Sequence, residues 1–371
     1  MEFSINRDVF LKSLSHAYGI IEKKTTLPIL SNVLIEAKNK KIKIIATDLD
    51  IIYSEEISIP DIKKEGSTTT SASVLYDILR KLETNSKIEF LLQDVNKLKL
   101  ISDNSKFNLL CISPDNFPLS NEDISEKTFE LSSQKILKLL NKTKISISND
   151  ETRHYLNGIY LHKIEKENKS FLSAVATDSH RLSLSRLEID KNTDFESIIL
   201  PKKTIFQLIS LLEQSASNIK ISNNKSKIKF EIDNGVLISK VIDGRFPDYN
   251  KVIPKDNDKV LQIKLSDFKN SIERVITVSS DRKEGLKMEI SKDNLQLSVR
   301  NPNSGEGTES IKAKFNSDNL NISFNSRYLI DIVSQIGNES IILNLKDPGS
   351  PVLVTDLSDE NSFHVVMPMK I

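Results

Sequence analysis

The stretch VIDGRFPDYNKVIP at residues 241–254 divides this sequence into comparable parts. It ends an apolar run, turns at Asp243-Gly244 and stops at two prolines that a central strand would not accept. Similar stretches, in which a proline ends an apolar run, occur around Pro118 and around Pro368. Pro118, Pro247 and Pro368 lie 129 and 121 residues apart. A repeat of that length predicts three copies of one domain.

Each predicted copy opens with a short strand followed by an amphipathic helix. The strands cover residues 3–5, 129–131 and 263–265, and each is followed by residues that favour a helix N-terminus. The candidate caps are Asn6 or Asp8 in the first copy, Ser132 or Ser133 in the second, and Ser266 in the third.

A second helix recurs later in each copy, with apolar residues at positions i, i+3, i+4 and i+7. These stripes are Leu75, Ile78, Leu79 and Leu82; Ile205, Leu208, Ile209 and Leu212; and Leu329, Ile332, Val333 and Ile336. Short helices gain most of their stability by packing an apolar face, so we expect each stripe to be buried against a sheet.

Alternating strands occupy the rest of each copy. A hairpin is predicted over residues 227–241, where Asn234-Gly235 supplies the positive φ of a tight turn. Strands and helices in this order indicate an α+β fold with antiparallel sheets and two helices per copy. The connectors at 120–127 and 250–259 are polar and charged, so the predicted domains are residues 1–127, 128–250 and 251–371.

Composition excludes several classes of protein. The chain has 371 residues, enough for two or three ordinary cores, and its 52 Lys and Arg nearly balance its 51 Asp and Glu. Cys111 is the only cysteine, which excludes an internal disulfide framework and a multi-cysteine metal site. Because the first residues lack an apolar signal core and no apolar run reaches spanning length, we expect a cytoplasmic protein with no membrane segment.

Basic residues recur on the predicted helices. Lys135, Lys138 and Lys142 share a side of one helix that faces away from Ile136 and Leu140. Basic residues on the other helices are Arg7, Lys12, Arg80, Lys81, Lys202, Lys203, Lys269 and Arg274. This pattern fits an ordinary solvated face, and it fits equally a wall that faces a phosphate backbone.

Catalytic motifs are weak in this sequence. Asp178, Ser179 and His180 are adjacent, but neighbouring Ser and His side chains on a strand point to opposite faces. The five histidines show no metal-ligand spacing, and no phosphate-binding glycine loop is present. We therefore expect neither a metal nor a cofactor.

Five motifs resemble the β sliding clamp family of bacterial DNA polymerase III, and the resemblance covers the whole chain. They are TLPILSN at 26–32, RHYLNG at 153–158, ATDSHRL at 176–182, DGRFPDY at 243–249 and VVMPMKI at 365–371. The resemblance implies a head-to-tail homodimer of three-domain protomers that forms a ring, with sheets outside and helices lining a channel for double-stranded DNA. It also implies a non-enzymatic processivity factor. The implied partners are the replicative polymerase catalytic subunit, the clamp loader and other proteins with a clamp-binding motif.

The resemblance implies a hydrophobic cleft for partner peptides between the second and third domains. The matching positions are Leu156, Thr177, His180, Arg181, Leu182, Pro247, Val252, Asn325, Tyr328, Val365, Val366, Met367, Pro368 and Met369. Leu, Val and Met suit an adaptable apolar floor. From residue types alone, Leu156, Leu182, Val365 and Val366 are better explained as ordinary strand core, and only the resemblance favours the cleft.

The family's DNA contacts correspond to Lys24, Arg153, His154 and Tyr155. Its subunit interface corresponds to Phe107 and Leu109 on one domain edge, against Thr277 and Val278 on another.

Two alternatives remain open at this stage. One is a monomeric peptide-binding scaffold. The other is a small-molecule hydrolase that uses Asp178, His180 and Arg181 at the cleft between the second and third domains.

Overall fold

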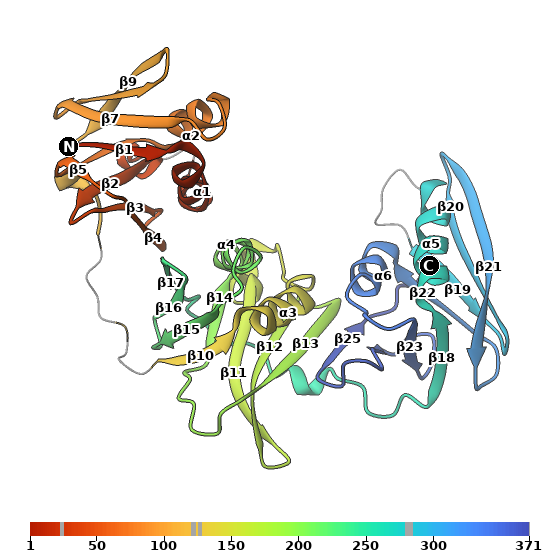
Figure 1. Ribbon diagram of the computed structural model, residues 1–371. Coiled ribbons are helices and arrows are strands. Elements are labelled where there is room, and N and C mark those ends of the chain that lie inside the picture. Colours follow the sequence, from red (N-terminus) through yellow and green to blue (C-terminus); the bar gives the residue numbers. More distant parts are fainter. Residues whose placement is uncertain (23–25, 120–123, 125–127, 279–284, 371) are drawn as a thin grey trace. The chain divides into compact units, whose positions relative to one another are not determined.

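The computed structural model describes residues 1–22, 26–119, 124, 128–278 and 285–370. The chain forms two compact units, whose helices and strands are labelled in Figure 1. The units consist of Met1–Leu137, Thr193–Glu196 and Lys203–Val241, and of Lys138–Asn192, Ser197–Lys202 and Ile242–Ile371. The central third of the chain therefore contributes to both units.

One order of elements occurs three times among the described residues: strand, helix, three strands, strand, helix, three strands. The first third contains β1 (Glu2–Asn6), α1 (Arg7–Tyr18), η1 (Pro28–Ser31), β2 (Asn32–Lys38), β3 (Lys41–Thr47), β4 (Ile51–Ser58), an additional β5 (Ile62–Lys64), β6 (Gly66–Ser71), α2 (Ala72–Lys81), β7 (Lys87–Asp94), β8 (Lys97–Ser102), β9 (Ser105–Ile112) and η2 (Pro114–Asn116). The central third contains β10 (Phe129–Ser132), α3 (Ser133–Lys144), η3 (Glu151–Leu156), β11 (Gly158–Lys166), β12 (Lys169–Thr177), β13 (Arg181–Ile189), β14 (Ile198–Pro201), α4 (Lys202–Leu212), β15 (Asn218–Asn223), β16 (Lys227–Ile232), β17 (Gly235–Lys240) and η4 (Tyr249–Lys251). The last third contains β18 (Lys259–Lys264), α5 (Leu265–Val275), η5 (Ile276–Val278), β19 (Gly285–Ile290), β20 (Asn294–Asn301), β21 (Gly305–Phe315), β22 (Leu320–Asn325), α6 (Ser326–Val333), β23 (Ser340–Leu345), β24 (Val352–Thr355) and β25 (Ser362–Val366). The predicted α+β class and the threefold repeat are confirmed.

Two long antiparallel sheets cross from one repeat into the next. The first has the order β10-β15-β16-β17-β4-β3-β2-β6-β9-β8-β7-β1-β5, and the second β14-β11-β12-β13-β25-β24-β23-β18-β21-β20-β19-β22. The crossings are the pair β4–β17, with Glu55 opposite Gly235, and the pair β13–β25, with Arg181 opposite Val366. Each internal junction therefore joins the fourth strand of one repeat, the one that ends its first group of three, to the last strand of the next.

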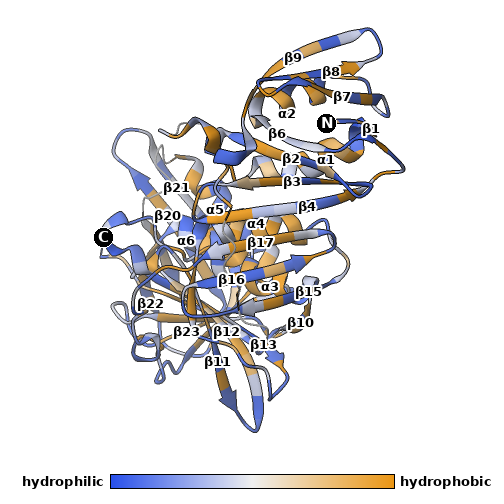
Figure 2. Ribbon diagram, turned by 90° about the vertical axis from the view of Figure 1, so that its left-hand side faces the viewer, coloured by the Kyte–Doolittle hydropathy of each residue, from blue (hydrophilic) through white to orange (hydrophobic). Residues whose placement is uncertain are grey.

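The apolar stripes of the second helices on α4 and α6 are buried as predicted, whereas in the α2 stripe Ile78 and Leu82 are only half-buried. Ile205, Leu208, Ile209 and Leu212 on α4 are each at most 5% exposed. Leu75 and Leu79 on α2 and Leu329, Ile332 and Val333 on α6 are also buried. In Figure 2, apolar (orange) and polar (blue) stretches alternate along the strands, as one buried face requires.

The predicted helix caps are partly right. Asn6 caps α1, and its side chain accepts hydrogen bonds from the N–H groups of Asp8 and Val9. Ser266 is not a cap, because α5 already begins at Leu265 and the capping position belongs to Lys264. The Leu265 N–H is instead satisfied by the carbonyl of Glu339 at 2.8 Å.

In two repeats, a glutamate that is the fifth residue of its strand links the sheet to a helix. Glu55 on β4 accepts a hydrogen bond from Ser13 of α1 at 2.8 Å and lies 3.0 Å from a ring nitrogen of His16. In the last third, Glu309 of β21 accepts a hydrogen bond from Ser271 of α5 at 2.7 Å. Arg274, in place of the histidine, donates to the same carboxylate at 2.9 Å. This shared contact fixes the correspondence between the first and last repeats.

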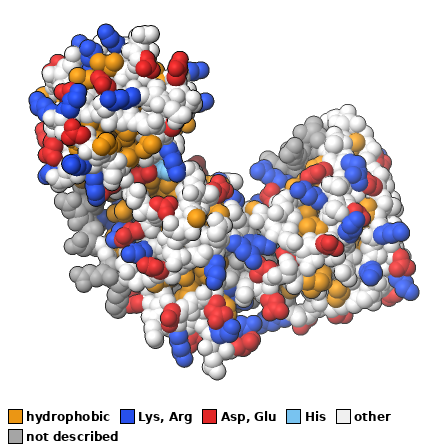
Figure 3. Space-filling view, viewed as in Figure 1, with side chains coloured by type: hydrophobic (Ala, Val, Ile, Leu, Met, Phe, Trp, Pro, Cys, Tyr) orange, Lys and Arg blue, Asp and Glu red, His pale blue; other side chains and the backbone are white. Residues whose placement is uncertain are grey.

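Two basic residues expected on a solvated helix face are buried. Lys142 lies between Asp356 and Asp359, 3.5 and 3.9 Å from their carboxylates, and also donates to a backbone carbonyl. Arg7 donates to the carbonyl of Leu79 at 2.6 Å. Local helical spacing cannot reveal such partners, because they come from distant parts of the chain. On the face shown in Figure 3, Lys and Arg (blue) are interspersed with Asp and Glu (red).

The glycine of the β16–β17 hairpin has a different role from the predicted one. The positive φ belongs to Asp233, at 51°, whereas Gly235 already pairs with Ile232 in the strand. A Cβ on Gly235 would lie 2.7 Å from the hydroxyl of Tyr53. This position therefore requires glycine for close packing rather than for its backbone angle.

Candidate functional site

The turn between β12 and β13 carries most of the ATDSHRL motif and is held by its own side chains. Asp178 Oδ1 accepts hydrogen bonds from the N–H groups of His180 and Arg181, each at 3.0 Å. Thr177 Oγ1 donates to the carbonyl of Arg181 at 2.8 Å and accepts from the Ser179 N–H at 3.1 Å. Ser179 has a φ of 76°, so this segment is a turn and not the strand assumed from sequence. The turn leaves His180 exposed.

Arg181 is buried between two carboxylates and an aromatic ring. Its Nε lies 3.1 Å from Asp178, and its Nη1 lies 2.6 Å from Asp331 on α6. The guanidinium carbon lies 4.3 Å from the centroid of the Tyr328 ring. The ring of His180 is 6.4 Å from the same ring. Arg181 therefore ties the start of β13 to α6 and positions Tyr328.

Asp331 was missed by the sequence analysis. It lies three residues after Tyr328 on a helix, so helical spacing puts both side chains on one face. That signal identifies a shared face but not the arginine that reaches it from β13.

Four of the expected cleft residues belong to the core. Leu156, Leu182, Val365 and Val366 are at most 3% exposed. The first three pack in one buried cluster with Val175, Leu184, Ile199, Phe246 and Tyr249. They can form the layer beneath a binding surface, but a ligand would meet the residues around them.

The exposed expected residues lie around this layer. Val252 is 50% exposed, Met367 and Met369 are each 38% exposed, and Pro247 is also exposed. The Met367 N–H donates to the carbonyl of His180 at 2.8 Å, which fixes the C-terminal segment beside the turn. Thr177, Tyr328 and Pro368 are half-buried.

Asn325 has a structural task at this surface. Its side chain caps α6 by accepting a hydrogen bond from the Arg327 N–H at 3.0 Å. A cap orients the helix that carries Tyr328 and Asp331.

A pocket of about 700 Å³ adjoins the C-terminal segment. The Met369 N–H donates to the carbonyl of Ser323 at 2.7 Å, which holds Met369 at its edge. The pocket is lined by Lys287, Asn321, Ile322, Ser323, Pro348, Gly349, Met369 and Lys370. Its two lysines give it a basic rim, which the sequence motifs did not indicate.

Two buried histidines lie in this sheet, His364 on β25 and His162 on β11. His364 is 1% exposed and its Nδ1 lies 2.8 Å from the hydroxyl of Ser183. Burial first, and then the positive charges of Lys142 and Arg181, lower the pKa of His364 to about 3. Burial likewise lowers the pKa of His162 to about 4. Burial also raises the pKa of the Tyr328 hydroxyl.

The expected nucleic-acid residues lie on η3, apart from Lys24, which falls outside the described residues. Arg153 Nε donates to Asp150 at 2.8 Å and its Nη1 donates to Ser179 at 2.6 Å. His154 Nε2 lies 3.1 Å from the carbonyl of Asp243, and Tyr155 packs against the buried cluster. These side chains are anchored to the same turn and joint as the candidate cleft.

The expected interface residues lie on or near two strand edges. β9 pairs with β8 over residues 105–110 and with β6 only at Cys111 and Ile112. Phe107 is half-buried and Leu109 is buried on this strand. On the other edge, Thr277 is exposed, and Val278 is half-buried against the core of the last third.

β21 resembles β9 in this respect. It pairs with β20 over residues 305–312 and with β18 only over residues 313–315. Among the described residues, 105–110 of β9 and 305–312 of β21 therefore lack a strand partner on one side.

Asp178 does not suit a catalytic role. Both of its carboxylate oxygens accept hydrogen bonds from the turn and from Arg181. Within the part of the chain that the structure describes, no group of three or more His, Cys, Asp or Glu could hold a metal ion. No helix among those residues is long and apolar enough to cross a membrane.

Family models for the three domains of the DNA polymerase III beta subunit match this chain. They cover residues 1–121 (N-terminal domain), 130–248 (central domain) and 250–370 (C-terminal domain). The beta sliding clamp of Caulobacter vibrioides is 34% identical over 373 residues, covering 100% of both chains. The crystal structure of a sliding clamp from Bartonella birtlesii bound to griselimycin is 37% identical, with a TM-score of 0.96 and 100% coverage of both chains. The beta subunit structure from Pseudomonas aeruginosa is 30% identical, with a TM-score of 0.92 and the same coverage.

Proposed function

The chain belongs to the beta sliding clamp family, the beta subunit of DNA polymerase III, and on that premise we propose that two copies close head to tail into a ring around double-stranded DNA. Members of this family are processivity factors and non-catalytic subunits of the polymerase, so this chain acts with DNA and a polymerase. The alternative function of a small-molecule hydrolase is therefore discarded.

One observation carries the ring proposal: the pattern of strand pairing. The first and central repeats are joined by β4–β17, and the central and last repeats by β13–β25. In both cases the fourth strand of one repeat pairs with the last strand of the next. The remaining fourth strand is β21 and the remaining last strand is β9, each with an unpaired edge among the described residues. Two copies satisfy both edges in a closed arrangement, with Phe107 and Leu109 of one copy against Thr277 and Val278 of the other.

The ring is tested by retention on DNA of different topology. The chain is loaded onto nicked circular DNA with a clamp loader and passed through a sizing column. We expect it to travel with the circle and to be released when a restriction enzyme linearises the DNA. A ring has no strong phosphate contacts to hold it once an end is available. Equal retention on circular and linear DNA contradicts the proposal, because direct contacts and not closure would then hold the chain. A protomer mass in sedimentation also contradicts it and favours a monomeric scaffold.

We also propose that the surface around Arg181 binds short apolar peptides of the polymerase, the clamp loader and other partners. The proposed residues are Leu156, Thr177, His180, Arg181, Leu182, Pro247, Val252, Asn325, Tyr328, Val365, Val366, Met367, Pro368 and Met369. Exposed methionines and a valine over a buried apolar layer support this assignment. Deletion of residues 367–371 is expected to abolish polymerase binding while the dimer persists in sedimentation. Loss of the dimer in that deletion contradicts the site.

For the channel, we propose that Lys24, Arg153, His154 and Tyr155 face DNA. Charge reversal of Lys24 and Arg153 to Glu is expected to slow loading, and unchanged loading contradicts the assignment. We propose domain boundaries at residues 127–128 and 250–251, and a cytoplasmic location.

A further inference from the structure

One short turn, η3, carries proposed DNA residues and also contacts the segments of the proposed peptide surface. Arg153, His154 and Tyr155 belong to this turn, which follows α3 along the chain. His154 Nε2 lies 3.1 Å from the carbonyl of Asp243, and Arg153 Nη1 donates to the hydroxyl of Ser179 at 2.6 Å. All of these residues lie in one compact unit. The two proposed surfaces therefore meet through a few hydrogen bonds.

The guanidinium of Arg153 has one charged and one neutral acceptor. Its Nε donates to Asp150 at 2.8 Å, and Asp150 is fixed as the cap of η3 by the Thr152 N–H at 3.0 Å. Ser179 is the weaker of the two acceptors, because hydrogen bonds between charged groups are the stronger ones. The side chain of Arg153 is 37% exposed, so a phosphate can reach it. A phosphate, which is also charged, can displace Ser179 more readily than Asp150.

Ser179 is an unusual residue for its backbone angle. Its φ of 76° lies in the left-handed region, which glycine adopts without cost and serine does not. The turn does not need the serine hydroxyl for its own hydrogen bonds, because Asp178 and Thr177 supply them. The hydroxyl instead accepts the bond from Arg153. A side chain held at a strained position for one external contact indicates a role for that contact.

The first repeat contains the same turn with a different residue at this position. In the β3–β4 turn, Asp48 Oδ1 accepts two backbone N–H bonds, at 3.0 and 2.7 Å, and Thr47 Oγ1 accepts the Leu49 N–H at 3.0 Å. Leu49 has a φ of 78° and is therefore the counterpart of Ser179.

The counterpart of Arg153 in the first repeat is also a leucine. Leu30 and Leu156 are both buried and each stands two residues before a strand, β2 or β11. Leu27 and Arg153 each stand three residues before these leucines. Leu27 is 51% exposed and Leu49 is 44% exposed. The turn therefore folds without an arginine–serine pair, and the pair belongs to the junction that carries the proposed peptide surface.

We propose that Ser179 is a positioning residue for Arg153, and that the bond between them couples the peptide surface to the DNA surface. The inference rests on the proposed roles of both surfaces. With the bond made, the turn that carries His180 and Arg181 is supported from η3, and a peptide meets an ordered surface. With the bond broken, Arg153 can bind a phosphate, and the turn loses that support. Each ligand therefore favours a different state of one hydrogen bond.

This coupling acts in both directions, as thermodynamic linkage requires. DNA at Arg153 weakens peptide binding, and a bound peptide keeps Arg153 on Ser179 and away from phosphate. A ring that carries a polymerase then makes fewer phosphate contacts than a ring without partners. Fewer phosphate contacts favour sliding.

The DNA side is tested by binding of a labelled linear duplex to the full-length chain at low salt, measured by fluorescence anisotropy. Ser179→Ala removes the hydroxyl and keeps a Cβ at the same backbone angle. It is expected to tighten DNA binding about two- to tenfold, because Arg153 loses a competing acceptor. Arg153→Gln is expected to weaken binding, and the double variant to bind like Arg153→Gln alone, because the serine acts only through the arginine.

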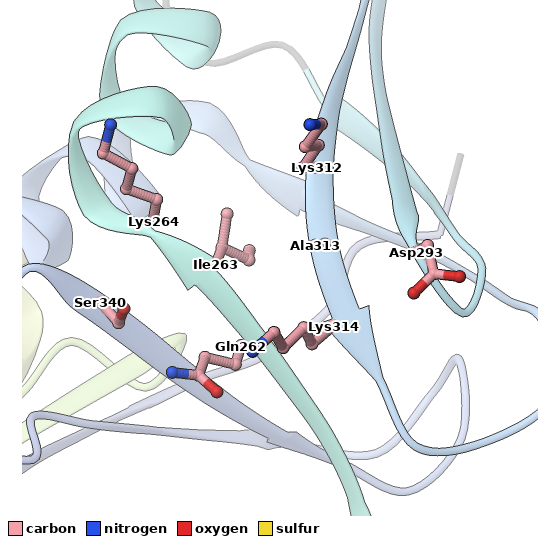
Figure 4. A pocket seen from close by; sticks show the side chains of 8 residues that line it. All are labelled: Gln262, Ile263, Lys264, Asp293, Lys312, Ala313, Lys314 and Ser340. Atoms are coloured by element: carbon pink, nitrogen blue, oxygen red, sulfur yellow. The ribbon is translucent and has the colours of Figure 1, made fainter.

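Two control variants accompany this measurement. Leu49→Ala makes a similar truncation in the counterpart turn and is expected to leave DNA binding unchanged. Lys314→Gln removes one positive charge elsewhere, in a pocket of about 420 Å³ that Lys264 and Lys312 also line (Figure 4). Its effect on DNA binding is expected to be smaller than that of Arg153→Gln.

The peptide side is tested by the affinity of the polymerase catalytic subunit for the chain in the absence of DNA. Ser179→Ala and Arg153→Gln break the same bond, so each is expected to weaken this affinity about two- to tenfold, with no further loss in the double variant. Leu49→Ala again serves as the control. Deletion of residues 367–371 shows separately whether the polymerase uses the proposed peptide surface.

The outcomes separate this inference from the proposals on which it rests. Unchanged DNA binding in Arg153→Gln overturns the DNA contact and the coupling together. Weaker DNA binding in Arg153→Gln, with Ser179→Ala equal to wild type, leaves the DNA contact standing and overturns the coupling. Tighter DNA binding in Ser179→Ala with unchanged polymerase affinity overturns the link to the peptide surface. If the deletion of residues 367–371 leaves polymerase binding intact, the peptide surface itself is wrong.

Discussion

Arg181 and His364 are both buried on paired strands of one junction. The Arg181 guanidinium is paired with the carboxylates of Asp178 and Asp331. His364 is neutral because burial and nearby positive charges disfavour its protonated form and lower its pKa. The buried imidazole is therefore stable at this junction only in its neutral form.

His364 predicts a loss of stability in acid. Its pKa is lowered from 6.5 to about 3 in the folded chain, so the unfolded chain binds a proton first as the pH falls. Its contribution is complete above pH 6.5 and is lost as the pH falls towards 3. Between about pH 7 and about pH 5, the free energy of unfolding should drop about 2 kcal/mol more in the wild type than in His364→Gln. Urea titrations at both pH values measure this difference.

A matched histidine checks the source of that difference. His180 is exposed, so His180→Gln should follow the wild type at both pH values. Equal pH dependence in His364→Gln and the wild type would show that folding does not lower the pKa of this imidazole.

Arg181→Met is expected to lower the free energy of unfolding by about 3 kcal/mol, because it leaves two carboxylates without their cation. Arg327→Met is the control: this arginine is exposed on the same helix as Asp331, and its loss should cost less than about 0.5 kcal/mol. Urea unfolding at neutral pH compares the two variants. Similar effects at both positions would mean that the ion pairs of Arg181 contribute no more to the free energy of unfolding than an exposed arginine does.

At the scale of elements, the β4–β17 pair depends on one close approach. Gly235 leaves room for the ring of Tyr53, whose hydroxyl donates to Glu55 at 2.7 Å. Glu55 in turn contacts α1 through Ser13 and His16. A strand pair, a helix and a buried carboxylate therefore share one packing constraint.

Gly235→Ala is expected to destabilise the chain by about 2 kcal/mol, because the new methyl group would overlap the Tyr53 hydroxyl. Gly337→Ala is the matched control, since its nearest neighbour would be 3.5 Å away and its φ is not in the left-handed region. Thermal unfolding of the two variants measures the contrast. An equal effect at Gly337 would contradict the packing argument.

Sequence patterns predicted those elements whose cause is local. The α4 stripe is buried because one helical face is apolar, and the Asn6 cap acts on residues two and three positions away. Ser266 failed as a cap because Glu339, far along the chain, already satisfies the first amide of the helix. The sequence pattern attributed Gly235 to the backbone angle of the turn, whereas the glycine is required because Tyr53 of another repeat packs against it.

In the candidate site, too, local patterns predicted some features and missed those that depend on distant residues. The family resemblance grouped Arg181, Tyr328 and Met367, but it could not distinguish the buried Leu182 from the exposed Met369. Exposure depends on how β13 and β25 pair, and no local pattern reports that pairing. Asp331 was missed for the same reason.

At the scale of the whole molecule, the near balance of 52 basic and 51 acidic residues matters more than any single contact. A protein held by six to ten phosphate contacts loses about 10³–10⁵ in affinity between about 50 and about 200 mM salt. A ring held by topology does not depend on those contacts.

Retention on nicked circular DNA should therefore change less than about tenfold over that range of salt. The measurement is the half-life of the loaded chain on circles at each salt concentration, with sedimentation of free chain as a control for ring opening. A thousandfold loss on circles, without dissociation of the free ring, would mean that charge rather than closure holds the chain.

Lys142 has a consequence for the history of this repeat protein. It stands where the outer repeats place His16 and Arg274, yet its own repeat has Ser185 where theirs have a glutamate. The central copy thus lacks a carboxylate of its own at this position, and Asp356 and Asp359 of the next copy pair with its lysine instead. The three copies are therefore not equivalent. A central repeat expressed alone would leave the Lys142 ammonium group without its carboxylate partners, so this repeat depends on the next one for its stability.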